Sequence, residues 1–106
     1  MNFVENLSLA EIDIVKCALN ATVEGSFFSD REFETLIGVN RETVKKVQQS
    51  FPRQTVDPEE FFCAVFGSMR NLLGYPHGRD EELIAYVPGG ASAVRNALDR
   101  LNELAV

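Results

Sequence analysis

The chain is poor in the residues that build metal, redox and disulfide sites. It has one histidine and two cysteines, and neither Cys17 nor Cys63 has a CxxC partner or a histidine cluster nearby. Both thiols are expected to be free and buried, because unpaired cysteine behaves as a small hydrophobic residue. One histidine without cysteine or clustered carboxylate partners is a poor metal ligand. We therefore expect no metal site and no cofactor.

Long apolar runs are missing as well. The opening residues, MNFVENLSLAEIDIV, contain no basic segment followed by an unbroken apolar one, and no later run is long enough to cross a bilayer. This pattern predicts a cytoplasmic protein without a membrane partner. Hydrophobic residues make up 45% of the 106 residues and charged residues 25%, as in ordinary globular proteins. We expect one folded domain over residues 1–106.

Strand signals are weak, whereas helix starts are frequent. Ser8 with Glu11 and Ser29 with Glu32 form capping-box patterns, and Asp57-Pro58 offers a third N-terminal cap. Further starts are expected after Asn40, at Asp80 and after the Pro-Gly-Gly turn. The sequence therefore predicts an all-α fold of about six helices, at 9–24, 30–37, 41–51, 58–73, 80–87 and 91–105.

The chain also matches itself. Residues 30–51 align with residues 80–101 and share Asp30/Asp80, Glu32/Glu82 and Val44/Val94, with the order helix, glycine turn, helix in both segments. This predicts two similar three-helix halves, a possible internal repeat of 9–51 and 58–105 joined by a linker at 52–57. Three identities are few, so duplication and coincidence both remain open.

The helices at 9–24 and 58–73 each carry two contact faces. The main face of the second contains Phe61, Phe62, Val65, Phe66, Met69, Leu72 and Leu73, and its back contains small residues at Ala64, Gly67, Ser68 and Asn71. The main face of the first contains Leu9, Ile12, Val15, Leu19 and Val23. We infer that these two helices are central and pack together, either within one chain or across a homodimer.

Charge is unevenly distributed. The net charge is −6, which argues against a protein whose whole surface binds the phosphates of nucleic acid. The segment from Arg41 to Arg53 holds four basic residues and one acidic residue, so it carries +3 and the remainder carries −9. One local basic face is expected in an acidic protein.

Residues 30–51 resemble the helix-turn-helix motif of DNA-binding proteins. The resemblance rests on Gly38 and Val39 in the turn, Asn40 as cap, and Val44 and Val47 on the buried side of the second helix. It implies that the second helix enters the major groove and presents Asn40, Arg41, Glu42, Lys45, Lys46 and Gln49. Glu34 departs from the motif, which has alanine there because the two helices approach closely. A corner with only a structural role is the alternative.

The stretch NLLGYPHGRDEE, residues 71–82, predicts a rigid loop. Gly74 can end a helix, Pro76 restricts the residue before it, and Gly78 permits a sharp change of direction. Tyr75, His77 and Arg79 are residue types that serve recognition, so they form the candidate protein-binding site. Turn chemistry alone is the alternative explanation.

No nucleotide-binding loop, zinc helix or calcium loop is present, and the acidic DPEE and RDEE stretches fit helix N-termini. We predict no catalytic residues and no enzyme. A helix containing ALN, then FETLIG, then NLLGYPHG is similar to small uncharacterised bacterial all-helical proteins, which implies a helical fold but no activity. The first hypothesis is a protein-interaction or regulatory module that binds another protein. The alternative is a helix-turn-helix protein that reads DNA through residues 40–49.

Overall fold

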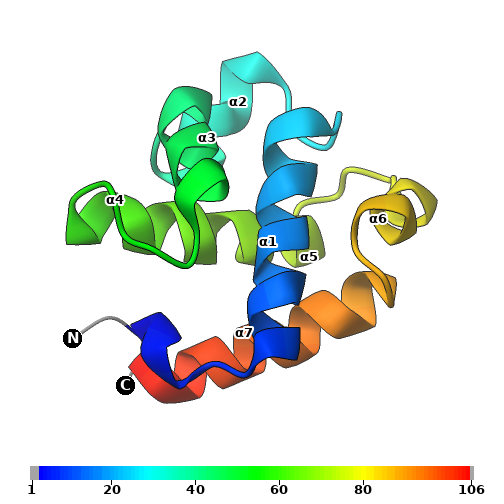
Figure 1. Cartoon of the computed structure of the whole chain (residues 1–106). Helices are drawn as coiled ribbons and strands as arrows, with labels where there is room; N and C mark the ends of the chain where they lie inside the picture. The colour runs from blue at the N-terminus through cyan, green and yellow to red at the C-terminus, as the bar shows by residue number, and fades with distance from the viewer. Residues whose placement is uncertain (1–2, 106) are drawn as a thin grey trace.

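Helices alone form the regular structure of residues 3–105, the range that this computed structural model describes (Figure 1). They are η1 (Phe3–Asn6), α1 (Leu9–Glu24), α2 (Asp30–Ile37), α3 (Arg41–Ser50), α4 (Pro58–Phe62), η2 (Cys63–Gly67), α5 (Ser68–Gly74), α6 (Asp80–Tyr86) and α7 (Gly90–Ala105). The predicted all-α fold is confirmed, with helix ends within one residue of those expected. Residues 1, 2 and 106 of the predicted domain lie outside the described range.

The helix starts follow the local cap chemistry. The Ser8 hydroxyl accepts a hydrogen bond from the Glu11 amide at 3.1 Å, and the Glu11 carboxylate accepts one from the Ser8 amide at 2.8 Å. Asp57 accepts from the Glu60 amide in the same way, at 2.9 Å. These bonds satisfy amides that have no partner inside the helix, which is why the starts were predictable from sequence.

α1 is the central helix (Figure 1), and it contacts α3, α5, α6 and α7. Val15, Ala18 and Leu19 are completely buried at these contacts. The predicted packing between the helices at 9–24 and 58–73 therefore occurs within one chain. Leu9 was wrongly assigned to the buried stripe, because it stands in the first turn of α1 and is 83% exposed.

The helix expected at 58–73 is continuous from α4 to α5 but contains a π-helical turn at η2. Gly67 lies in this turn, where any side chain would overlap the carbonyl oxygen of Ile37 at the end of α2. The side-chain nitrogen of Asn71, Nδ2, donates to the carbonyls of Leu36 and Gly67, both at 2.8 Å. The wide turn thus lets the end of α2 dock directly on the helix backbone.

The described residues pack into one compact body. The radius of gyration is 12.3 Å, close to the roughly 13 Å expected for a domain of this length. Each half contains a long helix followed by two helices joined through a left-handed glycine, Gly38 in the first half and Gly89 in the second. Common ancestry of the halves stays a prediction. None of the described helices has the length and apolarity required to span a membrane.

Candidate functional site

The corner between α2 and α3 has the local geometry that its sequence indicated. Gly38 ends α2 with φ of 102°, a conformation that favours glycine. The side-chain oxygen of Asn40 accepts a hydrogen bond from the Thr43 amide at 2.9 Å and begins α3. Val44 and Val47 are fully buried, while Glu34 is exposed. The corner is well formed, and Glu34 avoids the close approach by pointing outward.

Arg41, a predicted DNA contact, is turned inward instead. One guanidinium nitrogen donates to the carbonyls of Thr22 at 3.2 Å and Val23 at 2.9 Å, in the last turn of α1. The other donates to the Phe28 carbonyl at 3.1 Å and to the Asp30 carboxylate at 2.9 Å. A cation at a helix C-terminus is favourable because the carbonyls there are unpaired. The side chain is only 30% exposed, so its charge is used within the chain.

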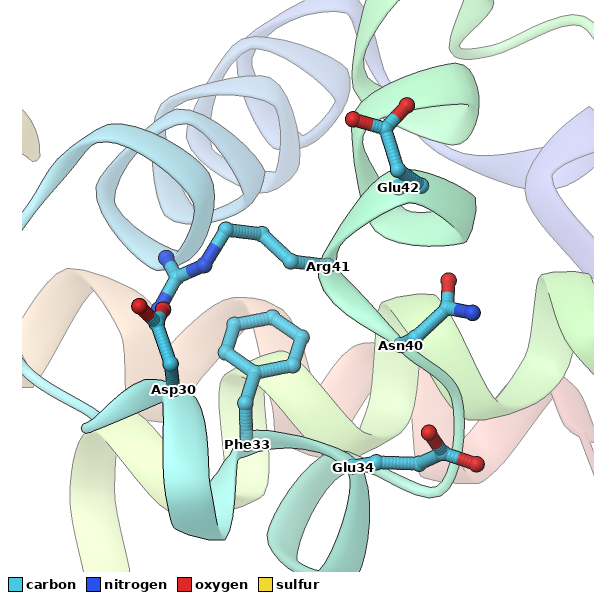
Figure 2. Close-up of a pocket in the computed structure, with 6 residues that line it drawn as sticks. All are labelled: Asp30, Phe33, Glu34, Asn40, Arg41 and Glu42. Carbon is cyan, nitrogen blue, oxygen red and sulfur yellow. The ribbon is translucent and has the colours of Figure 1, made fainter.

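A shallow depression of about 330 Å³ surrounds this arginine and is lined by Asp30, Phe33, Glu34, Asn40, Arg41 and Glu42 (Figure 2). The Arg41 side chain extends over the Phe33 ring, with its guanidinium carbon 4.4 Å from the ring centroid, toward Asp30. The other charged side chains of the lining are carboxylates. An anion such as a phosphate would meet these carboxylates and a cation that is already paired. These charges weigh against a phosphate contact at the start of α3.

The remaining predicted DNA contacts lie farther along α3. Lys45, Lys46 and Gln49 are exposed, and within the described residues neither lysine pairs with a carboxylate. Gln48, beside them, donates to the Asn20 side chain at 2.9 Å and holds α3 on α1. The basic face is thus real but smaller than the sequence indicated, because Arg41 does not belong to it.

The candidate loop after α5 is held by its own side chains. The Tyr75 hydroxyl donates to the Glu32 carboxylate at 2.9 Å, and the ring packs edge-on against Phe28 with centroids 5.6 Å apart. The hydrogen bond to Glu32 is the largest cause that raises the pKa of Tyr75 above its ordinary value of 10.0, and burial and the charge of Glu32 add to it. Tyr75 therefore ties the loop to α2.

His77 is engaged at both ring nitrogens. Nδ1 accepts a hydrogen bond from the Arg79 amide at 2.9 Å, so the ring proton lies on Nε2, which contacts the Leu72 carbonyl at 2.9 Å. The ring also packs edge-on against Phe27, with centroids 5.0 Å apart. The Arg79 guanidinium lies 3.6 Å from the Glu82 carboxylate. These contacts give the loop a structural role, and binding through Tyr75, His77 and Arg79 stays a prediction.

The structure adds a surface that the sequence analysis missed, on the continuous helix from α4 to α5. Phe62, expected in the buried stripe, is 39% exposed and stacks on the buried Phe66 with ring centroids 4.3 Å apart. The Arg70 guanidinium lies over both rings, 5.9 Å from Phe62 and 5.1 Å from Phe66. Among the described residues Arg70 has no carboxylate partner. We call Phe62, Phe66 and Arg70 the aromatic face.

Both cysteines are free, as predicted, but they are half-buried rather than fully buried. Across the part of the chain that the structure describes, no three His, Cys, Asp or Glu side chains are grouped so that they could hold a metal ion. Comparisons with protein-family models, with curated proteins and with solved structures found no match to this chain.

Proposed function

We propose that this protein is a non-enzymatic protein-interaction or regulatory module and that it binds protein through the aromatic face. The observation that carries the proposal is the partial exposure of the Phe62 ring, stacked on Phe66 beneath the Arg70 guanidinium. Aromatic and arginine side chains are enriched at the residues that dominate protein–protein binding energy.

The test is affinity capture from a lysate of the source cells, with protein partners quantified by mass spectrometry. Phe62→Ala and Arg70→Glu should each deplete the partners that the wild-type protein retains. Arg95→Glu changes another exposed cation, on α7, and is the matched control, which should retain them. Equal retention by all variants would overturn the assignment of this face, and the absence of any protein partner would overturn the function.

A second candidate function, DNA binding through α3, is supported by the exposure of Lys45, Lys46 and Gln49 next to the glycine turn. The internal bonds of Arg41 and the carboxylates around the start of α3 weigh against it. Selection from random duplex DNA at several salt concentrations tests it, with the Lys45→Glu/Lys46→Glu double variant beside the wild type. Specific binding must yield an enriched motif that weakens with salt and is lost in the variant.

A further inference from the structure

The helix from α4 to α5 carries opposite charges on either side of the aromatic face. Glu59, which is exposed, lies three positions before Phe62 and so shares its side of the helix. Arg70 flanks the rings at the other end. At about 1.5 Å per residue, Glu59 and Arg70 are about 16 Å apart along the helix axis. The order along the helix is therefore anion, aromatic rings, cation.

Such an order is its own complement when two helices lie antiparallel. Glu59 then faces the partner's Arg70, and Arg70 faces the partner's Glu59, so both ends form ion pairs of opposite charge. Phe62, the partly exposed ring of the aromatic face, lies between these ion pairs on each copy. A surface that is complementary to itself in this way is the requirement for a two-fold symmetric dimer.

We propose that the occupant of the aromatic face is a second copy of this chain, bound antiparallel along the helix from α4 to α5. The inference rests on the proposed function, because it names the partner of the same face. The charges select this partner, since Glu59 would repel an acidic segment drawn to Arg70, and Arg70 would repel a basic one. Nucleic acid is disfavoured because Glu59 would repel its phosphates.

The size of the surface sets the strength expected. A helix of this length is about 25 Å long and about 10 Å wide, so one face of it covers about 250 Å². This area is well below the roughly 800 Å² per partner that stable complexes bury. The dimer is therefore reversible and forms at high protein concentration, because its ion pairs lie at the edge of the interface and contribute little.

Sedimentation velocity over a wide concentration range tests this pairing with Glu59→Lys and Arg70→Glu. Wild-type protein should dimerise. Each single variant should remain monomeric at the same concentrations, because like charges then face each other at both ends. An equimolar mixture of the two variants should restore dimerisation, and so should the Glu59→Lys/Arg70→Glu double variant, because opposite charges are paired again. Phe62→Ala should raise the dissociation constant about tenfold or more.

Circular dichroism of each variant separates loss of dimer from loss of fold, and Arg95→Glu should dimerise like the wild type. A wild-type protein that stays monomeric, single variants that still dimerise, or a mixture that fails to dimerise would each overturn the pairing. If the wild type is monomeric but Arg70→Glu still loses captured protein partners, only this inference fails. If the wild type is monomeric and captures no protein, the proposed function fails as well.

Discussion

At the scale of single residues, Arg41 holds three segments of the chain together, whereas the sequence predicted only a contact to DNA. Its guanidinium bonds the last turn of α1, the loop at Phe28 and the start of α2. Arg41→Met removes these bonds and should lower the free energy of unfolding by about 2 kcal/mol. Urea denaturation measures this loss, with the exposed Arg53→Met as control. A loss no larger than that of the control would show that the bonds contribute nothing.

Ser68 is completely buried, yet its hydroxyl has no hydrogen-bond partner within the described structure. Ser68→Ala removes a desolvated and unpaired group, so stability should be unchanged or rise by up to about 1 kcal/mol. Thr22→Val is the comparison, because the buried Thr22 hydroxyl does donate to the Ala18 carbonyl at 3.0 Å and its loss should destabilise. Thermal unfolding distinguishes the two variants, and a Ser68→Ala protein less stable than Thr22→Val would contradict the assignment.

Tyr75 makes stability depend on alkaline pH. Because its pKa is raised in the folded state, the folded protein holds the hydroxyl proton more tightly than the unfolded chain does. This contribution is fully present below the ordinary pKa of 10.0 and is lost as the pH rises through the raised pKa. The stability difference between wild type and Tyr75→Phe should therefore be constant at neutral pH and shrink in strong alkali.

Urea denaturation from about pH 8 to about pH 11 measures this difference across the ordinary tyrosine range. Tyr86→Phe is the control, because it leaves the bond between Tyr75 and Glu32 intact. Its free energy of unfolding should decline with pH as that of the wild type does. If the difference in free energy of unfolding between wild type and Tyr75→Phe stays constant up to the most alkaline points, the Glu32 bond does not make stability depend on pH.

At the scale of elements, the end of α2 packs directly against the π-helical turn. Gly67→Ala would place a methyl group on the Ile37 carbonyl, so we expect a loss of about 2 kcal/mol or more in the free energy of unfolding. Gly74→Ala, at the end of the same helix, has open space and should be neutral or stabilising by up to about 1 kcal/mol. Chemical denaturation of both variants provides the comparison, and equal effects would contradict the close approach.

Sequence predicted the elements well because their ends depend on neighbours in the chain. Ser8, Asp57 and Gly38 act within a few residues, so their effect is visible in the letters. The π-helical turn depends on the contact between Gly67 and Ile37, which are distant in sequence. Phe62 looked like a core residue for a related reason, since periodicity does not tell which side of a two-faced helix remains uncovered.

At the scale of the molecule, folding changes which charges are available. Sequence alone gave the segment from Arg41 to Arg53 a charge of +3, but Arg41 is committed to Asp30 and to backbone carbonyls. The candidate residues Tyr75 and His77 are likewise held by contacts within the chain. Residue types identified the polar and aromatic groups that were candidates for binding, but contacts between distant segments set the direction of each side chain.

The most specific proposal made for this molecule is that a second copy of the chain binds the aromatic face and leaves α3 free. Amide NMR spectra recorded at increasing protein concentration test it most directly, because each amide reports its own surroundings. A dimer through the aromatic face should shift the amides of Glu59, Phe62 and Arg70 most and leave the amides of Lys45 and Lys46 unchanged. Shifts centred on α3, or no concentration dependence at any amide, would contradict it.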